Sequence, residues 1–125
     1  MTCQGFFAGS VKKFAKNYQR PILSNRFGGL SGTAVKPVAL KCVYDMYTAF
    51  GNDLPIIGVG GIAKWEDVVE FILAGAKAVQ IGTSIAYCED PINISLFTEL
   101  AEGLEKYLKK NKYQNLSEII GLAHE

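Results

Sequence analysis

Two short apolar runs that each end in glycine constrain the fold of this chain most. The first is Pro55–Ile62 (PIIGVGGI), and the second, Val79–Thr83 (VQIGT), follows after an interval long enough for one helix. Both runs are continuously apolar rather than alternating, which is typical of parallel strands that are buried on both faces. The pattern predicts two consecutive βα units of an α/β fold, with glycines where the backbone leaves each strand.

Helical periodicity fills the intervals around these strands. Apolar residues recur three and four positions apart from Pro37 to Gly51, from Trp65 to Gly75, and from Asp90-Pro91 into the lysine-rich stretch 106–112. The expected apolar faces are Val43, Met46, Tyr47 and Phe50; Trp65, Val68, Val69, Ile72 and Leu73; and Ile94, Phe97, Ala101, Leu104 and Leu108. We expect strands at 54–58 and 78–81, and a short terminal helix with Ser117 as its N-cap.

Length and composition limit the class of protein. The 125 residues predict a single domain over 1–125, with a loop and hairpin region at 1–35, βα units at 36–90 and C-terminal helices at 91–125. A net charge of +1 gives no general attraction to nucleic acid or to an anionic membrane. Three separated cysteines and one histidine do not suggest a metal site. No leader or long apolar run is visible, so we expect a cytoplasmic protein.

The glycines at two adjacent strand ends favour a phosphate site. In (β/α)₈ barrels the loops after the seventh and eighth strands commonly bind phosphate through backbone N–H groups. Such a bond needs an approach of about 2.9 Å, which a Cβ atom would often obstruct. Gly60-Gly61 and Gly82 meet this need, and Thr83 adds a hydroxyl donor. The simpler alternative is that these glycines only form tight βα turns.

A third glycine cluster, Gly28–Pro37, precedes the other two. Alone it is typical of a flexible loop before a helix. Together, the stretches 28–37, 58–62 and 74–83 have an order and spacing that resemble the C-terminal part of class 1 dihydroorotate dehydrogenases. The resemblance covers about residues 20–120. It implies the C-terminal portion of a (β/α)₈ TIM barrel, incomplete in this chain.

The resemblance also implies a function and a cofactor. The family carries out the FMN-dependent oxidation of dihydroorotate to orotate in pyrimidine biosynthesis, with a cysteine or serine base and hydride transfer to flavin N5. The residues that match its FMN-binding motifs, chiefly around the phosphate and ribityl chain, are Gly32, Gly60, Gly61, Gly82 and Thr83. The electron acceptor stays open: the tail 107–122 resembles the fumarate-using subclass, and the sequence Gly29-Leu30-Ser31-Gly32 resembles the subclass paired with a flavin and iron–sulfur subunit.

No catalytic residue is assigned, because the base and the substrate-binding residues of the family lie upstream of the matching part. Cys3 lies in a poorly aligned segment and is expected to be incidental. Lys36 is expected to be either a phosphate ligand or a solvated lysine, and His124 to be solvated. The pairs Glu66-Asp67 and Glu89-Asp90 are expected to be charges at helix N-termini. This chain alone is therefore expected to be inactive.

An incomplete barrel leaves apolar surfaces without partners. Two parallel strands, with a candidate third near the N-terminus, cannot close a cylinder. The chain could be a truncated product, associate with a complementary N-terminal half or form a homo-oligomer, which we favour. Alternative functions are a non-catalytic module that binds a phosphate ester, part of another phosphate-binding barrel enzyme such as one acting on a phosphosugar, and an inactive remnant with a role in assembly.

Overall fold

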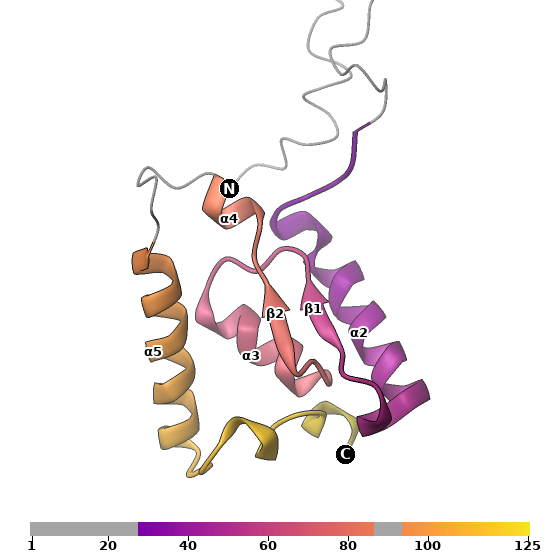
Figure 1. Cartoon of the computed structure of the whole chain (residues 1–125), viewed down its shortest axis with the longest axis vertical. Helices are drawn as coiled ribbons and strands as arrows, with labels where there is room; N and C mark the ends of the chain where they lie inside the picture. The colour runs from indigo at the N-terminus through magenta and orange to yellow at the C-terminus, as the bar shows by residue number, and fades with distance from the viewer. Residues whose placement is uncertain (1–27, 87–93) are drawn as a thin grey trace, which may run out of the picture.

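The computed structural model describes residues 28–86 and 94–125 (Figure 1). Its elements, in chain order, are η1 (Thr33–Val35), α2 (Lys36–Phe50), η2 (Gly51–Asp53), β1 (Ile57–Val59), α3 (Trp65–Leu73), β2 (Ala78–Gln80), α4 (Thr83–Ala86), α5 (Ile94–Lys110), η3 (Leu116–Glu118) and η4 (Leu122–His124). The expected hairpin region up to residue 27, the Asp90-Pro91 helix start, Cys3, Cys88 and Glu89 lie outside the described residues.

The two strands form a parallel pair, as the sequence predicts. Ile57 lies opposite Ala78, Gly58 opposite Val79, and Val59 opposite Gln80. The α3 helix is the crossover between them, so the strands and α3 make one βαβ unit. Both strands therefore end at the same side of the molecule, where η1 and α4 also lie (Figure 1).

Glycines end the first two helices at the predicted positions. Gly51, with φ of +57°, follows α2, and Gly75, with φ of +114°, follows α3. Both values lie in the region that residues with a Cβ rarely adopt, so glycine is the natural residue at these ends. A Cβ on Gly75 would also lie 2.2 Å from Cγ of Tyr47, which brings the end of α3 against α2.

The core lies around α3, which packs against the sheet, α2 and α5. Its buried members are Val43, Ile56, Ile62, Val68, Phe71, Ile72, Ala74, Ala76, Leu100 and Ile119. Phe71 is fully buried and contacts β1 at Gly58, where a Cβ would be only 2.5 Å from Phe71 Cδ1. A glycine in the strand thus provides the space for the largest side chain of the core.

The buried face of α5 differs from the predicted one. Phe97 is 52% exposed and Ala101 is exposed, whereas Leu100 is buried. The helix approaches α3 through Gly103, where a Cβ would be 2.2 Å from Cγ of Trp65. Because the missing side chain allows this close contact, the helix turns Gly103 and Leu100 inward, and Phe97 points outward. On α2, Met46 and Phe50 are likewise exposed, although they were predicted to be apolar contacts.

Two predictions for the C-terminal segment are wrong. The terminal turn is the 3₁₀ helix η3, and its N-cap is Asn115, whose Oδ1 accepts a hydrogen bond from the Ser117 amide at 3.0 Å. His124 is half-buried rather than solvated: its Nε2 donates to the Ala74 carbonyl at 3.0 Å, and its ring stacks on Tyr44 with a centroid distance of 3.9 Å. These contacts hold the end of the chain against α2 and the end of α3.

One face of the sheet is covered and the other is open, whereas burial on both faces was expected. Gly58 is buried under α3, but the side chains of Ile57 and Val59 on the opposite face are 53% and 52% exposed. Within 28–86 and 94–125 no element buries these two side chains. Two parallel strands cannot curve into a closed cylinder, so the described residues form an open α/β unit, as expected for part of an incomplete barrel. In the same residues no helix is long and apolar enough to cross a bilayer.

Candidate functional site

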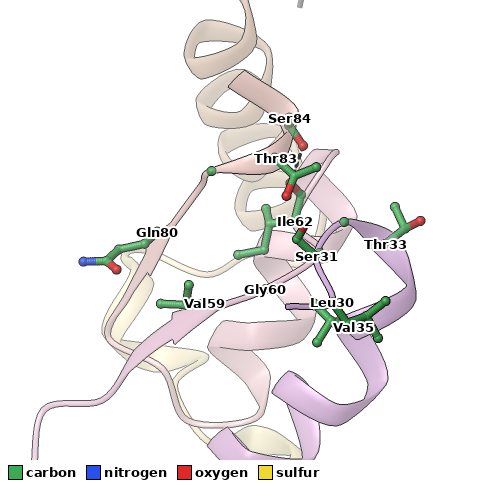
Figure 2. Close-up of a pocket in the computed structure, with 13 residues that line it drawn as sticks. Leu30, Ser31, Thr33, Val35, Val59, Gly60, Ile62, Gln80, Thr83 and Ser84 are labelled. Carbon is green, nitrogen blue, oxygen red and sulfur yellow. Dashed lines mark hydrogen bonds between the residues drawn. The ribbon is translucent and has the colours of Figure 1, made fainter. Parts of the chain in front are cut away.

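A pocket of about 300 Å³ lies at the ends of β1 and β2, where three loops meet (Figure 2). We refer to them as the first (28–35), second (60–64) and third (82–84) glycine loops. The residues that line the pocket are Leu30, Ser31, Gly32, Thr33, Val35, Val59, Gly60, Gly61, Ile62, Gln80, Gly82, Thr83 and Ser84. All five residues predicted to bind FMN are among them.

The first loop reaches the third through Gly32. This buried glycine has φ of +85°, and its carbonyl accepts a hydrogen bond from the Val35 amide at 3.1 Å. A Cβ on Gly32 would lie 3.6 Å from Cγ2 of Thr83, an ordinary van der Waals distance. The two predicted residues are therefore neighbours, although about fifty positions separate them in the sequence.

Gly60 and Gly61 are required for packing against α2, whereas the sequence predicted that they leave room for a phosphate. Their φ angles are +126° and +74°, which residues with a side chain rarely adopt. A Cβ on Gly60 would lie 2.9 Å from the Ala39 Cβ, and one on Gly61 would lie 2.7 Å from the Lys36 Cβ. These glycines bring the second loop against the first turn of α2, so their Cβ positions face protein rather than a ligand.

Gly82 has the role that the sequence predicted, which is to leave room for a ligand to approach the backbone. It lines the pocket, its φ is not positive, and a Cβ built on it would meet nothing within 4 Å. The third loop is held in place by Ser84, whose buried hydroxyl donates to the Ile62 carbonyl at 2.6 Å (Figure 2). The backbone at Gly82 is thus accessible from the pocket while α4 holds the loop against the second loop.

The sequence prediction missed several polar groups of the pocket. Ser31 and Thr33 bring hydroxyl groups and Gln80 brings an amide, while the hydroxyl of Ser84 already donates to Ile62. Each stands within two residues of a predicted glycine, which was the available signal in the sequence. None of the described lining residues is charged. An anion bound here would therefore interact with N–H and hydroxyl donors rather than with a formal cation.

Lys36 lies beside the pocket, and its ammonium is held by two carboxylates instead of being freely solvated. Its Nζ lies 2.6 Å from Asp67 Oδ1 and 2.8 Å from Glu70 Oε2. Asp67 also accepts, through Oδ2, the amides of Ala63 at 2.9 Å and Lys64 at 3.0 Å. Asp67 is thus a charge at the start of α3, as predicted, but it is buried and joined to α2 as well.

The ion pair shifts the pKa of both partners. Hydrogen bonds to Asp67 and then Glu70 raise the pKa of Lys36 above its ordinary value, against a smaller opposing effect of burial. Burial alone would raise the pKa of Asp67. The hydrogen bonds from Lys36, Ala63 and Lys64 together outweigh it, so the pKa of this carboxyl is lowered.

These directions give a prediction for stability against pH. Because the pKa of Asp67 is lowered in the folded chain, its contribution is fully present above about pH 4, the ordinary value, and is lost as the pH falls through the folded value. The wild type should therefore exceed Asp67→Asn in unfolding free energy by a constant amount at pH 5–7, and the difference should shrink below pH 4. Urea denaturation across this range measures it; a difference that grows on acidification would contradict the ion pair.

The fold and the pocket define an incomplete α/β barrel with glycine loops at the carboxyl ends of its parallel strands. The sequence profile of the dihydroorotate dehydrogenase family matches residues 8–108. The chain belongs to this family. It is 51% identical over 105 residues to the dihydroorotate dehydrogenase B (NAD(+)) catalytic subunit of Methanosarcina mazei, and 54% identical over 105 residues to that of Pyrococcus abyssi.

These relatives are much longer than the chain. The aligned 105 residues are 84% of this chain but 31% and 33% of the two relatives, so the chain spans about a third of their length. A crystal structure of dihydroorotate dehydrogenase from Eimeria tenella in complex with ferulenol matches with a TM-score of 0.70 and 36% identity. The match covers 80% of this chain and 26% of that one. The fold is therefore that of one part of the family's barrel.

Proposed function

We propose that this chain provides the FMN-phosphate-binding part of a dihydroorotate dehydrogenase, which oxidises dihydroorotate to orotate in pyrimidine biosynthesis. The observation that carries the proposal is the convergence of Gly32, Gly60, Gly61, Gly82 and Thr83 on one pocket at the strand ends. Family membership supports the same activity. It also excludes the alternative that the chain is part of another family of phosphate-binding barrels. A cytoplasmic location stays a prediction of the sequence.

The residues present fit the phosphate end of FMN. Gly82 leaves open space where a Cβ would stand, Thr83 brings a hydroxyl group, and the pocket of about 300 Å³ has the size of a small-molecule subsite. We infer that the glycine backbones approach the phosphate and that the Thr83 hydroxyl donates to it. When bound, FMN would accept the electrons removed from dihydroorotate.

Among the residues that the structure describes, the lining of the pocket offers no group suited to removing the substrate proton. Its described lining residues include no cysteine, histidine or carboxylate, and their serine and threonine hydroxyls have no neighbouring base among them. We therefore propose that this chain orients the cofactor and that the base comes from another part of the barrel.

The curated relatives bear on the electron acceptor. Both are catalytic subunits of the enzyme named dihydroorotate dehydrogenase B (NAD(+)). This supports the subclass to which the sequence Gly29-Leu30-Ser31-Gly32 pointed, rather than the fumarate-using subclass suggested by the tail. We propose that the chain belongs to a type B enzyme.

The open face of the sheet favours a further polypeptide partner. The exposed side chains of Ile57 and Val59 adjoin an apolar groove between β1 and α2, which is lined by Ala39, Cys42, Val43, Met46, Leu54, Pro55, Ile56, Ile57 and Val59. Parallel strands are normally covered on both faces. We propose that a complementary part of the barrel, or a second copy of this chain, covers this face. Val59 also lines the cofactor pocket, so the covering segment would border the bound cofactor.

Titration with FMN tests the proposed function. We expect the chain to quench flavin fluorescence saturably, and inorganic phosphate to compete. Gly82→Val should weaken FMN binding by about 5- to 150-fold, the equivalent of 1–3 kcal/mol, because the new side chain enters the pocket. It should leave the unfolding midpoint nearly unchanged, since the same position has no neighbour within 4 Å.

Two results would contradict the proposal. One is a wild-type chain that neither binds FMN nor responds to phosphate. The other is Gly82→Val binding FMN as tightly as the wild type. Wild-type binding of phosphate or of a phosphate ester without binding of FMN would favour the non-catalytic module instead.

A further inference from the structure

The first and second glycine loops are joined by a polar cluster behind the pocket. We call it the Lys36–Asp67 clamp: the Lys36 ammonium, the carboxylates of Asp67 and Glu70, and the backbone amides of Ala63 and Lys64. Lys36 is the first residue of α2 and directly follows the first loop, whereas Asp67 lies in the first turn of α3, the helix that begins directly after the second loop. The cluster thus joins the helices that begin where the two loops end.

The Asp67 carboxylate at the centre of the clamp is buried, and both of its oxygens are hydrogen-bonded. The Asp67 side chain is 5% exposed, with one oxygen bonded to Lys36 at 2.6 Å and the other to two backbone amides at 2.9 and 3.0 Å. Both amides belong to the second loop. Lys36 in turn presses on that loop: a Cβ on Gly61 would lie 2.7 Å from the Lys36 Cβ and 2.9 Å from both the Lys36 nitrogen and the Gly32 carbonyl oxygen.

The charge of Lys36 is directed away from the ligand space. Two carboxylates within 2.8 Å neutralise it, and Lys36 is not among the residues that line the pocket. A lysine beside a phosphate pocket would ordinarily be taken as a ligand of the anion. Here its ammonium is engaged on the opposite side, by acids of α3.

We propose that Lys36 and Asp67 are positioning residues that fix the distance between the first and second glycine loops, and so preorganise the pocket for the phosphate end of the cofactor. The clamp does not contact the ligand. It orients the backbone of Gly32, Gly60 and Gly61, as outer partners orient the ligands of other sites. The proposal rests on the proposed function for the identity of the ligand.

The test compares Lys36→Met with Lys41→Met. Both variants remove one ammonium from α2. Lys36 pairs with two acids of α3, whereas Lys41 pairs with Asp45 on the exposed side of the helix, away from the loops. Hydrogen exchange of the ligand-free chain is measured at the amides of Val35, Ala63 and Lys64. We expect faster exchange at all three in Lys36→Met and unchanged exchange in Lys41→Met. The Tyr113 amide, bonded to the Leu108 carbonyl at 3.0 Å, serves as the internal reference.

FMN titration of the same variants separates positioning from direct binding. Lys36→Met should weaken FMN binding by about tenfold, a size found for residues that orient ligand-contacting groups. Adding Asp67→Asn removes the carboxylate left without its cation and keeps an acceptor for the two amides. The double variant should therefore recover most of the lost affinity. A lysine that bound the phosphate directly would show no recovery.

The outcomes distinguish the two proposals. If the wild type does not bind FMN, the proposed function fails, and the exchange data alone decide whether the clamp holds the loops. If the wild type binds FMN, the clamp is wrong when Lys36→Met behaves as Lys41→Met in both measurements. It is also wrong if exchange rises without loss of affinity, or if the double variant binds no better than Lys36→Met.

Discussion

Replacing Phe71 with alanine is expected to lower the free energy of unfolding by about 3–5 kcal/mol. Phe71 is fully buried and fills the space that Gly58 leaves on the inner face of β1. Truncation would leave a cavity between α3 and the sheet that the backbone can close only in part. Because a domain is stable by only about 5–15 kcal/mol, this single change should bring the chain close to unfolding. Urea denaturation followed by far-UV circular dichroism measures the loss.

Phe97→Ala is the matched control, since it removes the same side chain from α5. Phe97 is 52% exposed, so the expected change in unfolding free energy is within about 0.5 kcal/mol. Equal losses in the two variants would mean that α5 packs through Phe97, as the sequence pattern predicted. The described orientation of α5 would then be wrong.

Gly61→Ala is expected to weaken FMN binding by about 5- to 150-fold. The φ of +74° at this position would cost an alanine about 1–3 kcal/mol of strain, and its Cβ would collide with the first turn of α2. Relief of the collision requires the second loop to move away from Gly32 and Lys36, which separates two of the three loops of the pocket. FMN titration and the thermal unfolding midpoint should both report the change.

Gly29→Ala is the control for this variant. Gly29 belongs to the same first loop that Gly61 contacts, but a Cβ on it would meet nothing within 4 Å. We expect FMN affinity and the unfolding midpoint close to those of the wild type. If Gly29→Ala weakened binding as much as Gly61→Ala, general loop flexibility rather than the packing at Gly61 would govern the pocket.

The sequence was sufficient for the elements that carry a strong local signal. The helix stops at Gly51 and Gly75 were confirmed, because positive φ angles favour glycine whatever surrounds them. The parallel pair was confirmed too, since continuous apolar runs separated by one helix leave few other arrangements. The family was identified correctly from the order of three glycine clusters, which is a property of the sequence alone.

Predictions from the sequence were wrong where the position of a side chain depends on contacts with residues far away in the sequence. Phe97 fits the apolar period of α5, but the helix approaches Trp65 through Gly103, and a count of apolar residues does not include a glycine.

Lys36 precedes a proline in a glycine-rich stretch, and nothing near it in the sequence indicates the two acids that pair with it, which lie 31 and 34 positions later. His124 was predicted to be solvated because it is near the terminus, yet Tyr44 and Ala74 hold it.

The sequence by itself determined the βαβ unit, the helix ends, the family and the set of glycines at the strand ends, because each depends on backbone conformation or on residue order along the chain. Only the tertiary structure showed that the five predicted residues line one pocket. It also showed that Gly60 and Gly61 face α2 while Gly82 faces open space, and that Lys36 forms an ion pair with Asp67. These facts depend on contacts between residues far apart in the chain, and such contacts form only when α2, α3 and the sheet pack together.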